Sequence, residues 1–258
     1  MRTTRTTLRD SEYPESDGQP MAESDSHRNE LLRLLQILAA FFARWRLVYV
    51  SGNNFIYYEP DNIHASVSPD VYVVKGVPKG ERRVYFLWRE GVAPQVVIEL
   101  TSRSTRTNDQ GEKRRLYERL GVHEYYLYDP LGEWLHPGLL GYRLGANGYE
   151  AMTSAVAGGL LSDELGMRLV LERGRLQFYD LSTGERLLSP EEQAEVALER
   201  AEAETQRADT ERQRATGEAE ARRAAEARAD EADAARRAAE ARLAELTALL
   251  HDRLPPTE

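Results

Sequence analysis

The stretch from residue 68 to residue 113 decides the fold. It contains three short pieces, Ser68-Pro69-Asp70, Val96-Val97-Ile98-Glu99-Leu100 and Asp109-Gln110-Gly111-Glu112-Lys113. Asp70 precedes an apolar run at 71–74, and Glu99 follows a run of β-branched residues, the composition of short buried strands. We therefore expect both carboxylates at strand ends.

Lys113 is predicted to lie on the inward face of a helix over residues 109–120. Leu116, Tyr117 and Leu120 follow it at three, four and seven residues, which is the spacing of one helix face. Two strand-end carboxylates and an inward lysine suit a metal-assisted hydrolase. The carboxylate oxygens can hold a hard cation, and the ammonium group can orient an attacking water.

Taken in order, these residues resemble the Uma-type restriction endonuclease family, a branch of the PD-(D/E)XK phosphodiesterase superfamily. The resemblance covers roughly residues 28–184, and it implies an α/β fold with a central mixed sheet flanked by helices. The matching positions are Pro69, Asp70, Glu99, Ser102, Asp109, Lys113, Tyr117, Gly121, Val122, Glu124, Tyr125, Asp129 and Pro130.

The resemblance also implies an activity, a metal-dependent DNA endonuclease that hydrolyses phosphodiester bonds with Mg²⁺ or Mn²⁺. Asp70 and Glu99 would hold the metal, and Lys113 would complete the catalytic set. Asp109, Tyr117 and Glu30 are supporting candidates. Glu30 has a second interpretation, as an acid favoured by the dipole near a helix N-terminus.

One departure from the superfamily pattern concerns the lysine. The position two after Glu99, where the superfamily name places it, is Thr101. The resemblance implies that Lys113 supplies the amine from the helix instead. Thr101 also favours an alternative, a catalytically inactive nuclease fold that acts as a binding or scaffold protein through its C-terminal helix.

A third interpretation is a structural protein in which Asp70, Glu99 and Lys113 form only a buried ion-pair network. Burying three charged groups without full hydrogen bonding is costly, so convergence on a cleft is the better expectation.

The chain divides into three predicted segments: a disordered arm at 1–26, a nuclease domain at 27–188 and a helical tail at 189–258. Within the domain we expect a helix at 27–45, a hairpin around the turn at 51–54, and a series of strands between 141 and 180 that extends the sheet.

The tail begins with Ser189-Pro190-Glu191-Glu192, a helix-start signature, and continues rich in Ala, Glu and Arg. At ~1.5 Å per residue it predicts a helix on the order of 90 Å long. Leu243, Leu246 and Leu250 have the a, d, a spacing of a coiled coil, which predicts a homodimer through this helix. A solitary charged helix is the alternative, because alanine and Gly217 weaken the seam.

Composition limits the remaining possibilities. Residues 1–190 carry 23 Lys and Arg against 25 acidic residues, whereas 191–258 carry 11 against 18, so most of the net charge of −9 belongs to the tail. A near-neutral domain is compatible with DNA as a partner. The chain has no cysteine, which excludes disulfides and thiolate metal sites. Without a long apolar run, we expect no membrane span and a cytoplasmic protein.

Overall fold

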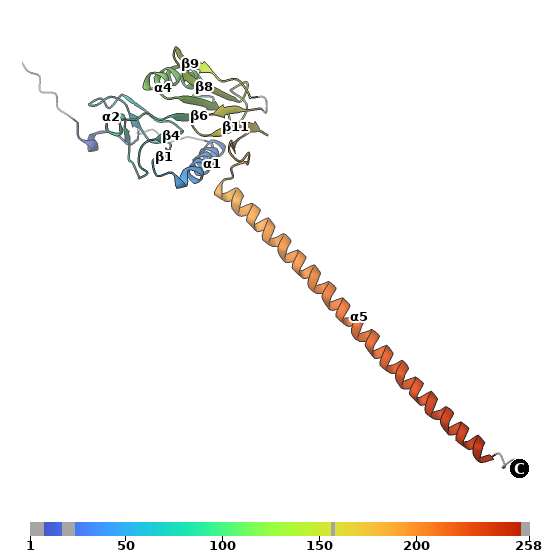
Figure 1. Ribbon diagram of the computed structural model, residues 1–258. Coiled ribbons are helices and arrows are strands. Elements are labelled where there is room, and N and C mark those ends of the chain that lie inside the picture. Colours follow the sequence, from blue (N-terminus) through green and yellow to red (C-terminus); the bar gives the residue numbers. More distant parts are fainter. Residues whose placement is uncertain (1–7, 17–23, 156–157, 254–258) are drawn as a thin grey trace, which may run out of the picture. The chain divides into compact units, whose positions relative to one another are not determined.

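The computed structural model describes residues 8–16, 24–155 and 158–253, and the chain divides into two compact units at residue 193. The first unit is built on a six-stranded mixed sheet in the order β1-β4-β6-β7-β8-β9 (Figure 1). Only β6 and β7 run parallel to each other in this sheet. The predicted α/β fold with a central mixed sheet and flanking helices is confirmed. The strands are β1 Val48–Ser51, β4 Val71–Lys75, β6 Val96–Leu100, β7 Glu124–Tyr128, β8 Leu139–Gly145 and β9 Gly148–Ala151.

One face of the central sheet packs against helix α1 (Asp25–Phe41) and a separate small sheet. That sheet consists of β10 Leu160–Ser162, β11 Met167–Glu172 and β12 Arg175–Asp180. Leu34 and Leu38 of α1 join this core with Val71, Val73 and other apolar side chains of β4, β6 and β7. A 3₁₀ turn, η2 (Phe42–Arg44), ends the helical segment. The regular spacing of leucines along α1 thus builds one half of the core.

The opposite face packs against a second small sheet and a broken helical segment. The sheet has the order β3-β2-β5, with β2 Ile56–Tyr57, β3 Ser66–Val67 and β5 Tyr85–Phe86, and β5 leads into α2 (Leu87–Glu90). The helical segment comprises α3 Arg106–Asn108, η3 Asp109–Lys113 and α4 Arg114–Leu120. Because side chains alternate along a strand, Val97 and Glu99 of β6 face this layer.

Two strand pairings differ from the prediction. The hairpin expected around residues 51–54 is wrong, because β1 pairs with β4 whereas β2 pairs with β3 and β5. The turn is tied to other segments: Asn53 N donates to Pro69 O at 2.8 Å, and Tyr72 Oη donates to Asn54 Oδ1 at 2.9 Å. Likewise β8 and β9 extend the central sheet as predicted, but β10–β12 form their own sheet.

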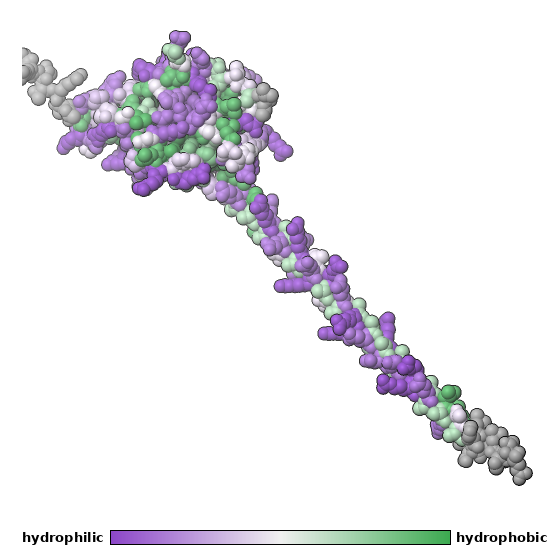
Figure 2. Space-filling view, in the orientation of Figure 1, coloured by the Kyte–Doolittle hydropathy of each residue, from purple (hydrophilic) through white to green (hydrophobic). Residues whose placement is uncertain are grey.

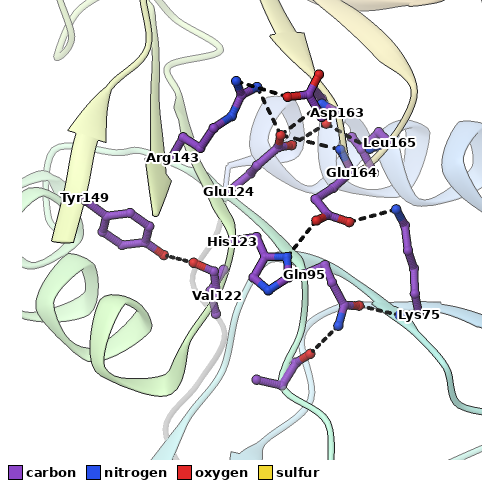
Figure 3. A network of polar contacts seen from close by, with 12 residues as sticks. Lys75, Gln95, Val122, His123, Glu124, Arg143, Tyr149, Asp163, Glu164 and Leu165 are labelled. Atoms are coloured by element: carbon purple, nitrogen blue, oxygen red, sulfur yellow. Dashed lines mark hydrogen bonds and ion pairs between the residues drawn. The ribbon is translucent and has the colours of Figure 1, made fainter. Parts of the chain in front are cut away.

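Glu124, at the start of β7, ties this separate sheet to the central one (Figure 3). Its buried carboxylate accepts hydrogen bonds from Ser162 Oγ, from Asp163 N at 2.9 Å and from Tyr126 Oη at 3.0 Å. Arg143 lies 3.3 Å from the same carboxylate. A carboxylate with this many donors is well satisfied although buried, so Glu124 acts as a structural residue.

The N-terminal arm differs from the disordered segment predicted at 1–26. Residues 1–7 and 17–23 lie outside the described residues, but residues 8–16 contain a short 3₁₀ helix, η1 (Asp10–Glu12). Tyr13 is buried against Tyr57 and Phe86, with ring centroids 4.9 Å apart in each pair. Leu8 packs against the same cluster, so two apolar residues anchor this segment, although the average composition of residues 1–26 is polar.

The long C-terminal helix is confirmed as α5, which spans Pro190–Arg253 and contains 64 residues. Its start has reciprocal hydrogen bonds, since Glu192 N donates to Ser189 Oγ and Ser189 N donates to Glu192 Oε2. Figure 2 shows hydrophilic residues along much of α5, with strongly hydrophobic ones toward its C-terminal end. No helix among the described residues combines the length and hydropathy needed to cross a bilayer.

Gly52 tests how tightly the turn before β2 supports Asp70. A Cβ on residue 52 would lie 1.9 Å from the Asp70 carbonyl oxygen and 3.3 Å from Leu35 Cδ2. We expect Gly52→Ala to lower the free energy of unfolding by about 1–3 kcal/mol in urea denaturation, because the backbone must shift. Gly111→Ala is the matched control, since its Cβ would meet no atom within 4 Å. A Gly52→Ala variant within about 0.5 kcal/mol of wild type would contradict this packing.

Candidate active site

Asp70 lies where the start of β4 meets the end of β6. The two strands are antiparallel with Val71 opposite Ile98, which brings residue 70 beside residues 99 and 100. Asp70 Oδ2 accepts a hydrogen bond from Leu100 N at 2.7 Å, and Asp70 N lies 3.4 Å from Glu99 Oε2. The backbone of β6 therefore fixes one oxygen of the Asp70 carboxylate.

Glu99 is fully buried and is held by two residues of the helical segment. Tyr117 Oη donates to Glu99 Oε1 at 2.7 Å, and Lys113 Nζ lies 2.9 Å from Glu99 Oε2. Lys113 and Tyr117 are four residues apart, so both reach Glu99 from one face of the segment. The structure thus brings Asp70, Glu99, Lys113 and Tyr117 together.

The helix predicted as continuous over 109–120 contains a π-helical turn at Asp109–Lys113. Tyr125 Oη of β7 donates to the Asp109 carbonyl oxygen at 2.9 Å. The Asp109 side chain is buried, and its Oδ1 lies 3.4 Å from Lys113 Nζ. A π turn widens the helix by one residue, and such turns are frequent at functional sites. Here it accompanies the placement of Asp109 and Lys113 on the side that faces Glu99.

Three carboxylates thus interact with one ammonium group, and the four groups would carry a formal charge of −2 if all were ionised. Burial opposes the charged form of Lys113, but the charges of Glu99, Asp109 and Asp70 outweigh this effect and raise its pKa. Lys113 therefore remains protonated at neutral pH. Burial also raises the pKa of Tyr117, which keeps its hydroxyl as a donor to Glu99.

The three carboxylates differ in how readily they ionise. Burial raises the pKa of Glu99 to about 8, and Lys113 only partly offsets this effect. Burial likewise raises the pKa of Asp109. For Asp70, burial is outweighed by His27, Lys113 and the Leu100 amide, so its pKa is lowered. Asp70 is therefore the site's most stable anion, and Glu99 readily retains a proton while no further cation is bound.

A pocket of about 600 Å³ opens onto this cluster. Asp70 and Lys113 line it directly, whereas Glu99 lies behind them with no exposed surface. The remaining lining residues come from the start of α1 and from the segments that follow β6 and β7; they are Ser24, His27, Ser102, Arg103, Ser104, Thr105, Leu131 and Trp134. Asp70 and Lys113 thus form the pocket wall, and Glu99 lies directly behind them, next to both residues.

His27 is a site residue that the sequence analysis missed. It lies on the first turn of α1, lines the pocket, and places its Nε2 3.9 Å from Asp70 Oδ1. The available signal was its position one helical turn before Glu30, which was itself a candidate.

Glu30 has different neighbours. Its carboxylate lies 2.5 Å from Arg33 Nη2, accepts a hydrogen bond from Tyr128 Oη at 3.2 Å, and lies 3.6 Å from Arg175. No hydrogen bond or ion pair found among the described residues links Glu30 to Asp70, Glu99 or Lys113.

Thr101, in the usual lysine position, is also buried.

The donor set fits a hard divalent cation. Among the described residues no group of three or more His, Cys, Asp and Glu side chains forms a ready-made metal cage. Mg²⁺ typically uses one or two carboxylates and keeps several waters, which suits Asp70 and Glu99 beside a pocket. A divalent cation would also stabilise the ionised forms of Glu99 and Asp109, whose pKa values burial raises, because Lys113 can neutralise only one of the three carboxylates.

Comparison with known proteins identifies one matching family model, described as "Uma2: Putative restriction endonuclease", over residues 4–176. A matching crystal structure, at 1.96 Å resolution, is described as "a putative nuclease belonging to DUF820 from Anabaena variabilis ATCC 29413". It has 14% sequence identity, covers 57% of this chain and 76% of that chain, and gives a TM-score of 0.42. No curated protein matches this chain.

The raised pKa of Glu99 predicts a pH-dependent stability. Between about pH 4.5 and pH 8 the folded protein retains a proton that the unfolded chain releases, so stability falls as pH rises through this window. We expect Glu99→Gln, measured by urea unfolding in EDTA, to lose less stability than wild type between pH 5 and pH 8. Parallel pH profiles for the two proteins would contradict the prediction.

Proposed function

The chain belongs to the Uma2 family, whose model matches residues 4–176, and on this premise we propose that it is a metal-dependent DNA endonuclease that hydrolyses phosphodiester bonds. The observation that carries the proposal is the convergence of Asp70, Glu99 and Lys113 at one pocket. We further propose that the protein acts on DNA and that it does so in the cytoplasm.

Asp70 and Glu99 would hold Mg²⁺ or Mn²⁺, which supplies positive charge toward the phosphate and lowers the pKa of a bound water. Lys113 lines the pocket as an ammonium group, so it can orient the attacking water and offset negative charge that develops on the phosphate. Tyr117 and Asp109 position Glu99 and Lys113, since their polar groups contact these two residues rather than line the pocket. His27 stands beside Asp70 and can orient its carboxylate.

The catalytic role of this cluster predicts different effects for its members. We expect Asp70→Asn to lower cleavage of plasmid and oligonucleotide DNA by more than about 100-fold, and Lys113→Ala by about 100- to 1,000-fold. The two variants should differ in metal binding. Added Mn²⁺ should raise the melting temperature of Lys113→Ala but not of Asp70→Asn, because the lysine is not a ligand.

Asp163→Asn is the matched control, since Asp163 is exposed and contacts Arg143 away from the pocket. It should cleave DNA at the wild-type rate in Mg²⁺ or Mn²⁺. Wild-type cleavage by Asp70→Asn would reject the proposed site, and equal loss of metal binding and turnover in Lys113→Ala would make that residue structural.

The second candidate function is a nuclease-fold scaffold without turnover, and the length and exposure of α5 favour it. The cleavage experiment decides between the two functions. A protein that binds Mn²⁺ and DNA but cuts neither strand under these conditions would be the scaffold.

We further propose that α5 pairs with its counterpart in a second chain. Leu243 and Leu246 support this, because their side chains are 69% and 55% exposed while alanine dominates the preceding turns. The Leu250 side chain lies outside the described part of the chain. Two helices paired here would bring two nuclease units into one assembly.

Replacement of both leucines tests this pairing in the full-length chain. Leu243→Glu/Leu246→Glu should convert a dimer to a monomer in sedimentation equilibrium, because burying glutamates at the seam is unfavourable. Leu198→Glu is the control, as Leu198 is equally exposed but lies near the other end of α5. Identical masses for wild type and the double variant would show that these leucines do not mediate self-association.

A further inference from the structure

Trp134 is held in the pocket by a rigid loop that follows β7. The buried Asp129 carboxylate accepts hydrogen bonds from four backbone amides of this loop, with Leu131 N and Gly132 N on Oδ1 and Trp134 N and Leu135 N on Oδ2. A carboxylate saturated by charge-assisted hydrogen bonds fixes the backbone. The backbone position of Trp134 is therefore set before any ligand arrives.

The sheet brings this loop to the same pocket as the catalytic cluster. Strands β6 and β7 are parallel, so the segments that follow them leave the same edge of the sheet. The segment after β6 brings Arg103 to the pocket, and the loop after β7 brings Leu131 and Trp134. The Arg106 guanidinium lies over the indole, with its Cζ 5.6 Å from the ring centroid.

The pocket thus combines two kinds of surface. Asp70 and Lys113 offer charge suited to a metal-bound phosphate, whereas Trp134, half-buried, and Leu131, 56% exposed, offer an apolar wall. Its volume of about 600 Å³ is within the range of about 300–1,000 Å³ usual for small-ligand sites. A ligand that fills both parts carries a phosphate and a flat apolar group, which is the composition of a nucleotide.

We propose that Trp134 stacks on an unpaired nucleobase beside the cleaved phosphate, so that the substrate is single-stranded or locally unpaired DNA. This inference rests on the proposed nuclease function and specifies its substrate class. In a continuous duplex the neighbouring base pairs cover both faces of each base, so an indole cannot reach one. Single strands leave base faces free, and stacking on aromatic side chains is a general mode of binding them. The exposed Arg103 and Arg106 supply charge for the flanking phosphates.

Cleavage of one labelled sequence in three forms tests the inference with the full-length protein: as a single strand, as a perfect duplex, and as a duplex with a short unpaired gap. We expect faster cleavage of the single strand and of the gapped duplex than of the perfect duplex. Trp134→Leu, which keeps an apolar side chain, should slow single-strand cleavage by about 10-fold or more. Trp134→Phe, which keeps an aromatic face, should restore most of the rate. Faster cleavage of the perfect duplex, or equal slowing of all three forms by Trp134→Leu, would overturn the inference and leave the nuclease function standing.

Intrinsic fluorescence provides a measurement that does not require turnover. Unlabelled oligothymidine should quench the fluorescence of the Lys113→Ala protein in Mn²⁺, and the further change Trp134→Phe should abolish the quenching, although Trp45 and Trp88 remain. Quenching of Trp134 fluorescence, together with a wild-type protein that cuts none of the three DNA forms, would support the base-binding site while rejecting the nuclease function. Quenching that persists in Trp134→Phe would overturn the inference.

Discussion

The arrangement of the first unit depends on a charge imbalance at the end of β6. Three carboxylates, Asp70, Glu99 and Asp109, are placed around the single ammonium group of Lys113. Such a cluster is expensive in a protein interior unless protons or a cation compensate it. The antiparallel pairing of β4 with β6, the π-helical turn and the hydrogen bond from Tyr117 all hold it together. These contacts hold together carboxylates that outnumber the nearby ammonium group. Such a cluster adds little to the stability of the fold, so a bound cation is the better explanation for it.

Two other buried carboxylates show what a structural role looks like in the same unit. Glu124 begins β7 and Asp129 directly follows it, and each accepts several hydrogen bonds from backbone amides or hydroxyl groups. Glu124 joins two sheets, and Asp129 organises a loop. By contrast, the Asp109 carboxylate has one cation 3.4 Å away, shared with Glu99. Residue type and order alone place these five carboxylates in one motif. The number of hydrogen-bond donors around each carboxylate separates Glu124 and Asp129, which shape the fold, from the three that form the cluster next to the pocket.

The sequence predicts the features that depend on local pattern. Apolar runs next to Asp70 and Glu99 identify the strands β4 and β6, and helical spacing identifies the face that carries Lys113 and Tyr117. Features that depend on distant partners are not predictable in this way. The π turn accompanies a hydrogen bond from Tyr125, on another element, and β2 pairs with β3 and β5 rather than with its sequence neighbour β1. On α1, helical spacing identifies an inward face but not which of its polar residues reaches the site. Glu30 pairs with Arg33 of the same helix and with Arg175 of β12, whereas His27 lies beside Asp70.

In α5, helix formation and association depend on different residues. The eight residues Ala221–Arg228 recur without change as Ala235–Arg242, fourteen residues later, which is two heptads. The repeat carries Arg222 paired with Glu226 and Arg236 paired with Glu240, each four residues apart on one helix. Such pairs stabilise an isolated helix and require no second chain. Because alanine buries little area at a helix interface, attraction between two such helices would come mainly from leucines such as Leu243 and Leu246. The length of the helix can therefore be maintained without a second chain, and any pairing would depend mainly on a few residues near its C-terminal end.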